Sequence, residues 1–89
     1  MGKTNTEETT VVLVANKDID KYVYSALRTP KCIIKARGTN VKRAIDTALI
    51  CERNYGMIID DVTIYNSPLE MDDKVRYVSN IDITLHKEV

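Results

Sequence analysis

The chain has 89 residues, with 13 Lys and Arg against 13 Asp and Glu and 44% hydrophobic residues, which is typical of one small globular domain with a thin core. Its longest apolar run, Val11–Ala15, is far too short to span a membrane, and residues 1–10 lack the apolar segment of a secretory signal, so we expect a soluble cytoplasmic protein. Cys32 and Cys51 form no CxxC pair and the chain has a single histidine, so the sequence supports no disulfide framework, zinc site or Cys–His catalytic pair.

The first predicted elements are a strand, a short helix and a second strand, which follow a flexible arm over residues 1–9. The β-branched residues 9–15 are apolar at adjacent positions, which is typical of a strand buried on both faces. Asp18 is a candidate N-cap for a helix that ends before Pro30. The apolar stripe of this helix consists of Ile19, Val23, Ala26 and Leu27, and the second strand covers residues 32–37.

A turn and a longer helix come next. Gly38 opens the turn, and either Thr39 or Asn40 is the N-cap of the helix. The helix runs to about Tyr55 and stops at Gly56. Its apolar stripe has helical spacing and consists of Val41, Ala44, Ile45, Ala48 and Leu49.

After Gly56 the apolar period changes from about 3.6 to about 2 residues, which indicates strands. One strand covers residues 58–66 and is broken at Ser67-Pro68, and a turn at Asp72-Asp73 leads into a final strand. The odd-numbered residues of that final strand, from Val75 to Leu85, share one face. We expect the outer part of this hairpin, about residues 66–77, to project because it has few apolar residues to bury.

The element order β-α-β-α-β-β predicts the fold class. A helix between the first two strands favours a right-handed parallel crossover, and both helices are then expected to cover one face of a four-stranded mixed sheet. The prediction is an α/β (α+β) two-layer sandwich that forms a single domain over residues 10–89.

The residues that could carry catalysis are few. The chain has no Gly-rich phosphate loop or nucleophile motif, and His86 lies on the last strand without a predicted partner. Asp60-Asp61 and Asp72-Asp73 do not predict a metal site, because adjacent strand residues point to opposite faces and Asp pairs are common turn formers. We therefore expect that the protein is not an enzyme and that it uses no cofactor or small-molecule substrate.

The joint between the second strand and the second helix is the strongest candidate site. Lys35 and Arg37 have the same parity on a strand, and Gly38 and Asn40 lie where a helix N-terminus presents free N–H groups to anions. Lys17 follows the first strand and would lie at the same edge of a parallel sheet. Lys42 and Arg43 add two more cations. The alternative is that Lys35 and Arg37 only keep an exposed strand soluble.

The neutral total hides an uneven charge distribution. Residues 11–55 contain nine basic and four acidic side chains, whereas residues 56–89 contain three basic and seven acidic ones. Zero net charge therefore does not exclude binding to nucleic acid by a local basic surface.

Several motifs resemble the Alba family of archaeal chromatin and nucleic-acid-binding proteins. They are Val12-Leu13-Val14 with Asn16-Lys17, Ile34-Lys35-Ala36-Arg37-Gly38, and Lys42-Arg43-Ala44-Ile45-Asp46. The resemblance covers nearly the whole chain from Val11 to Lys87. It implies a fold akin to the C-terminal domain of translation initiation factor 3. It also implies a homodimer that binds double-stranded DNA, and often RNA, with weak sequence preference and associates with the chromosome.

In the family, loop lysines contact phosphates while two hairpin arms reach along the minor groove. Lys17 matches the second of two family loop lysines, Lys35 and Arg37 match its central strand, and Tyr55 matches an aromatic residue in contacts between dimers. Arg43 matches a basic helix position. The predicted nucleic-acid-binding residues are Lys17, Lys35, Arg37, Gly38, Asn40, Lys42, Arg43, Lys74 and Arg76.

The chain departs from the family at the first loop and at the hairpin tip. Ala15 and Asn16 stand where the family has Gly and its first lysine, an acetylation position. The tip carries Glu70, Asp72 and Asp73, which the minor groove would repel. Lys74 and Arg76 are the only basic residues in the outer part of the hairpin. A dimeric DNA-binding protein is the leading hypothesis, with an RNA-binding protein or a protein-interaction scaffold as alternatives.

Overall fold

The computed structural model describes residues 8–88, within which the chain forms four strands and two α-helices. In chain order these are β1 (Thr9–Leu13), α1 (Ile19–Ala26), β2 (Lys31–Arg37), a short 3-10 turn η1 (Gly38–Asn40), α2 (Val41–Tyr55), β3 (Ile58–Met71) and β4 (Lys74–His86). The predicted order β-α-β-α-β-β is confirmed. The flexible arm predicted for residues 1–9 falls mostly outside the described residues, and β1 begins at Thr9.

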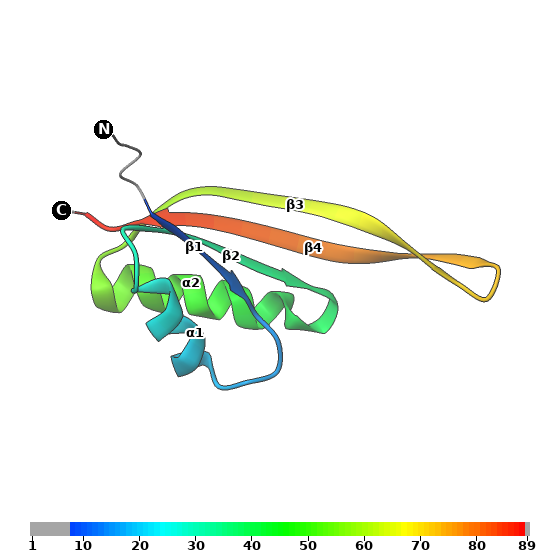
Figure 1. Cartoon of the computed structure of the whole chain (residues 1–89), viewed down its shortest axis with the longest axis horizontal. Helices are drawn as coiled ribbons and strands as arrows, with labels where there is room; N and C mark the ends of the chain where they lie inside the picture. The colour runs from blue at the N-terminus through cyan, green and yellow to red at the C-terminus, as the bar shows by residue number, and fades with distance from the viewer. Residues whose placement is uncertain (1–7, 89) are drawn as a thin grey trace.

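The strands form one mixed sheet in the order β1-β2-β4-β3. β1 and β2 are parallel because α1 carries the chain back between them, whereas β4 runs antiparallel to both β2 and β3. Both helices lie on one side of this sheet, and the β3–β4 hairpin extends well beyond them (Figure 1). The predicted two-layer α+β architecture is therefore confirmed.

The core lies between the helices and the covered face of the sheet. Small side chains of α2, such as Ala44 and Ala48, allow the helix to lie close to Ile34, Ile83 and Leu85. Cys32 and Cys51 are free thiols in this core. Burial raises the pKa of Cys32 to about 11 and also raises that of Cys51, so neither thiol is a reactive nucleophile.

The prediction that the first strand is buried on both faces is wrong. Val12 and Val14 are buried, but Val11 is 51% and Leu13 is 70% exposed. The helices cover only one face of the sheet, so alternate residues of the edge strand β1 remain in solvent. An apolar run on both faces was a poor indicator of burial here.

The helix ends agree closely with the predicted positions. α1 begins after Asp18, whose backbone is extended, although its side chain makes no capping hydrogen bond. α2 ends at Gly56, which takes the left-handed conformation with φ of 69°. The N–H groups of Gly56 and Met57 donate to the carbonyls of Glu52 and Cys51 and close the last turn of the helix.

The predicted break at Ser67-Pro68 is also wrong. β3 continues through Pro68, which lies opposite Tyr77, to Met71. Because β3 is an edge strand, the missing N–H of a proline costs no bond to a further strand. The turn at Asp72 and Asp73 is confirmed, and both residues have positive φ, as tight hairpin turns require.

The outer part of the hairpin has no other element beside it in the sheet. β2 ends where Arg37 pairs with Asn80, and Asn80 pairs in turn with Tyr65. From Asn66 to Ser79 the two strands therefore pair only with each other. We call this two-stranded segment the arm and the rest of the domain the body. No helix in the described part of the chain is long and apolar enough to cross a membrane.

Candidate functional site

The face of the sheet that the helices leave uncovered, called here the open face, carries the predicted basic residues of β2. The register places Lys35 between Leu13 of β1 and Asp82 of β4, and Arg37 beside Asn80. Cys32 and Ile34, at the alternate positions of β2, are buried beneath the helices. Lys35 and Arg37 therefore both lie on the open face, as their spacing indicates.

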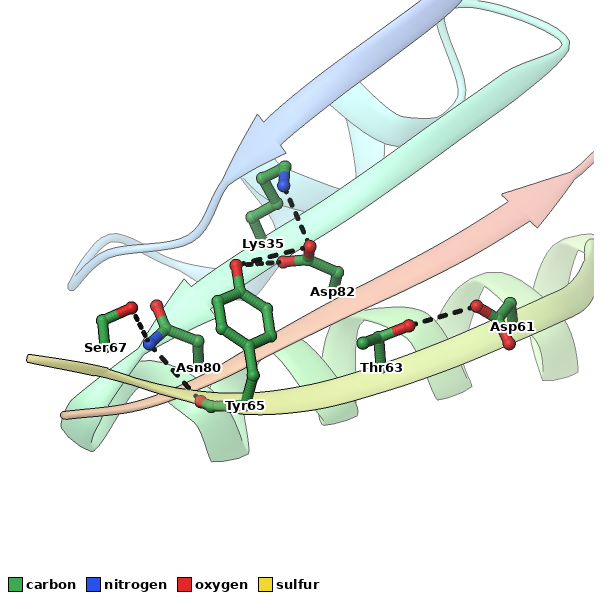
Figure 2. A network of polar contacts seen from close by, with 7 residues as sticks. All are labelled: Lys35, Asp61, Thr63, Tyr65, Ser67, Asn80 and Asp82. Atoms are coloured by element: carbon green, nitrogen blue, oxygen red, sulfur yellow. Dashed lines mark hydrogen bonds and ion pairs between the residues drawn. The ribbon is translucent and has the colours of Figure 1, made fainter. Parts of the chain in front are cut away.

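Lys35 is held by a polar network across three strands (Figure 2). Its Nζ lies 3.0 Å from Oδ2 of Asp82, and the Tyr65 hydroxyl donates to the same carboxylate at 3.3–3.4 Å. The hydrogen bond to Asp82 raises the pKa of Lys35 above its ordinary value. The lysine is thus firmly protonated, but its charge is already partly balanced by a carboxylate.

A shallow hollow of about 390 Å³ lies on the open face around Lys35 and Arg37. The side chains of Leu13 and Tyr65 give it apolar walls, while Lys35, Arg37 and Asp82 give it charge. Tyr65 is 43% exposed. Arg37 is exposed and has no ion pair within residues 8–88, so its guanidinium is available to a ligand.

The loop between β1 and α1 is fixed from two sides. The buried Tyr22 accepts hydrogen bonds at its hydroxyl from the backbone N–H groups of Ala15 and Lys17, at 2.9 and 3.0 Å. Arg43 of α2 donates to the Ala15 carbonyl at 2.9 Å. These bonds hold Lys17 in a fixed loop with its side chain exposed. Arg43 therefore positions the loop, in addition to the phosphate role predicted for it.

The start of α2 differs in detail from the predicted cap. Gly38 has a φ of 62°, a conformation that favours glycine, and Asn40 occupies the N-cap position in a helical conformation without a side-chain capping bond. The N–H of Val41 donates to the Gly38 carbonyl, so the N–H groups that lack a partner within the helix belong to the preceding turn η1. Lys42 is exposed and forms an ion pair with Asp46 at 2.9 Å. That pair is of the weak i,i+4 surface type.

The basic residues of the arm continue the open face. In the hairpin register Leu69 pairs with Arg76 and Met71 with Lys74, which places both cations on the same side of the ladder as Tyr65. Glu70 lies on the other side, opposite Val75. The acidic charge is therefore confined to the turn and to the side of the arm away from its cations.

Tyr55 lies apart from the basic residues. It is 51% exposed at the C-terminal end of α2, whereas the basic cluster lies at the N-terminal end of this helix. Fifteen helical residues separate the two ends by about 22 Å. The structure does not bring Tyr55 into the candidate site, which leaves it available for a separate contact.

His86 has a partner, contrary to the prediction. A register shift between Ile59 and Asp61 makes a β-bulge, and this places Asp60 next to His86, with Nδ1 2.8 Å from Oδ2. A bulge on an edge strand has no clear signal in the sequence. Within the described residues, no group of three or more His, Cys, Asp or Glu could hold a metal ion.

The structure thus assembles Lys17, Lys35, Arg37 and the start of α2 at one end of the sheet, next to the base of the arm. The residues missed from the sequence are Tyr22, Tyr65 and Asp82. Strand parity places Asp82 and Tyr65 on the polar side of the hairpin strands, but the register between distant strands is needed to bring them to Lys35.

Comparisons with known proteins show what this chain is similar to as a whole. No protein-family model matches the chain. A relative from Nitrosopumilus maritimus (strain SCM1), named DNA/RNA-binding protein Alba, is 34% identical to this chain, and the match covers 93% of this chain and 96% of that protein. The solved structure of Alba from Thermoplasma volcanium matches with a TM-score of 0.77 at 26% identity, over 88% of this chain and 100% of that one.

Proposed function

Because the chain belongs to the Alba family, we propose that it is a nucleic-acid-binding protein of the chromosome-associated type that binds duplex DNA as a homodimer, with weak sequence specificity. The observation that carries this proposal is the open face, where Arg37 and Lys35 of the body are continuous with Arg76 and Lys74 of the arm. The relative from Nitrosopumilus maritimus is named as a DNA/RNA-binding protein.

The proposed contacts are to phosphates. Lys17 and Arg37 are exposed and have no ion pair among the described residues, so they are the principal contacts. Lys35 and Lys42 must exchange a carboxylate for a phosphate, which lowers their net contribution. Phosphate contacts position a protein but do not read bases, so all duplex sequences should bind with similar affinity.

The proposed dimer uses an apolar strip beside the edge strand β3. On β3, Val62 is 51% and Ile64 is 75% exposed, and both lie on the helix side of the sheet. Val41 of α2 lines a hollow with Ile64, and Ile45 and Leu49 extend the strip along the same side of the helix. A second copy of this chain is the proposed occupant, because the strip is apolar and carries an unpaired strand edge, a combination that suits the pairing of one surface with itself in a two-fold dimer.

Light scattering and duplex titration test the two parts of the proposal. The protein should have twice its chain mass of 10.1 kDa, and Ile64→Asp should convert it to a monomer, whereas Ile58→Asp, at a half-exposed position off the strip, should not.

In duplex titrations, log K should fall against log salt with a slope of about −4 to −7, for roughly four to eight phosphates contacted per dimer. Absence of binding at about 50 mM salt would contradict the proposal and favour a protein-interaction role.

RNA is the second candidate ligand. The acidic tip, with Glu70, Asp72 and Asp73, would be repelled in the narrow minor groove of DNA but handicaps binding to a structured RNA less, because RNA presents phosphates at many angles. Competition between duplex DNA and a structured RNA at equal salt concentration distinguishes the two ligands.

A further inference from the structure

We infer that the hollow on the open face binds an unpaired nucleobase, which stacks on the ring of Tyr65. The inference rests on the proposed function and goes beyond its phosphate contacts by naming the class of nucleic acid that this site selects. The observations are the position and restraint of one aromatic ring, the apolar wall beside it, and the cations that flank both.

The ring of Tyr65 is placed as a stacking platform. Figure 2 looks onto the open face, with the helices behind the strands, and the ring lies across β4 toward Lys35 and Asp82. Its hydroxyl donates to Asp82, whose carboxylate also holds Lys35, so the ring is fixed at its outer end. With 43% of the residue exposed, the ring is supported by the sheet from below and open to solvent above.

The surroundings of the ring suit one nucleotide. Leu13 is 70% exposed and lines the same hollow, which gives a base a second apolar contact. Arg37 and Lys35 also line the hollow, so they can meet the phosphates on either side of a base. The volume of about 390 Å³ lies within the range of about 300–1,000 Å³ for small-ligand sites.

The ligand must be unpaired, because the bases of a duplex stack on each other and expose only their edges. Exposed aromatic side chains on an open sheet face are a general means of binding single-stranded nucleic acid, since every base has a flat π-face. A duplex would contact Arg37 and Lys17 through phosphates and leave Tyr65 unused. The two kinds of ligand are therefore separable by one side chain.

The experiment compares the full chain with Tyr65→Ala, Tyr65→Phe and the matched control Tyr24→Ala. Tyr24 is 65% exposed on α1, in the other layer of the domain. The ligands are an unstructured oligouridylate, the corresponding oligodeoxythymidylate, and a mixed-sequence duplex DNA, all at about 50 mM salt. Circular dichroism confirms that each variant is folded.

The expected result is that Tyr65→Ala weakens single-strand binding about tenfold and changes duplex binding less than twofold, whereas Tyr65→Phe, which keeps the ring, loses much less. Tyr24→Ala should change neither. Equal losses for the RNA and the DNA strand identify the base as the ligand. A loss confined to RNA means that contact with Tyr65 also depends on the 2′-hydroxyl of the ribose. Unchanged single-strand binding, or equal losses on single strand and duplex, would overturn the inference. Failure of the proposed function is distinct, because the unmodified protein would then not bind the duplex, whatever the effect of Tyr65→Ala on the single strands.

Discussion

The body and the arm differ in how firmly their basic residues are held in place. In the body, hydrogen bonds fix three of the basic positions: Lys35 is bonded to Asp82, Arg43 to the Ala15 carbonyl, and the loop of Lys17 to Tyr22. In the arm, Lys74 and Arg76 lie on a two-stranded ladder that no helix covers. The difference indicates that the body supplies preorganised contacts, while the arm supplies reach and charges of mixed sign.

The largest expected difference between the two regions is in stability. Leu85 and Val75 lie on the same face of β4, but Leu85 is fully buried in the body and Val75 is 54% exposed in the arm. Leu85→Ala should lower the free energy of unfolding by about 2–5 kcal/mol through the cavity it leaves, and Val75→Ala by about 0.5 kcal/mol or less. Urea denaturation followed by circular dichroism measures both. A comparable loss for Val75→Ala would mean that the arm packs against something, such as a second copy of the chain.

Charge reversal at Arg37 should have the largest effect on binding. Arg37→Glu removes a contact and adds repulsion in each protomer, so duplex affinity should fall on the order of 10- to 100-fold at about 50 mM salt, equally for all sequences. Lys21→Glu is the control, since Lys21 is an exposed cation on α1. Electrophoretic mobility shifts with several unrelated duplexes provide the measurement. A loss confined to one sequence would indicate base readout at Arg37.

Most of the architecture could be predicted from the sequence, because helix stripes, Gly56 and the Asp72-Asp73 turn are local signals. The two failures among the strands, β1 burial and the break at Pro68, both concern the arrangement of the whole sheet, which no local pattern contains. Alternate residues of β1 are exposed because both helices lie on the other face of the sheet, and Pro68 is tolerated because β3 is a sheet edge.

The candidate site could be predicted only in part, for a related reason. Lys35 and Arg37 share a face by parity within one strand, so the sequence is sufficient to pair them. Asp82 and Tyr65 reach Lys35 through the registers of β2 with β4 and of β3 with β4. These registers depend on packing between distant segments. The ion pair between Asp82 and Lys35 therefore could not be predicted from the sequence.

Replacing Asp82 tests whether the polar network of the body competes with a phosphate for Lys35. Asp82→Asn frees Lys35 for a phosphate, so duplex affinity should rise several-fold and the salt slope should steepen by about one per added contact. Asp60→Asn is the matched control, because Asp60 is also a paired carboxylate but its partner is His86, at the other end of the sheet. The salt dependence of duplex binding, measured by fluorescence anisotropy, decides the matter. Lower affinity in Asp82→Asn would mean that the network chiefly orients Lys35 and does not compete for it.

The acidic tip should give the smallest effect. Asp72→Asn with Asp73→Asn keeps the turn, since asparagine tolerates the positive φ of 48° and 64° at these positions. Duplex affinity should rise about two- to fivefold at about 50 mM salt and the gain should vanish near 0.5 M, because repulsion at an exposed tip is screened beyond the Debye length. Unlike Asp82→Asn, the change adds no phosphate contact, so repulsion alone is relieved. A gain that persists at high salt would place the tip in direct contact with the ligand, and the arm would then contribute a fixed contact as the body does.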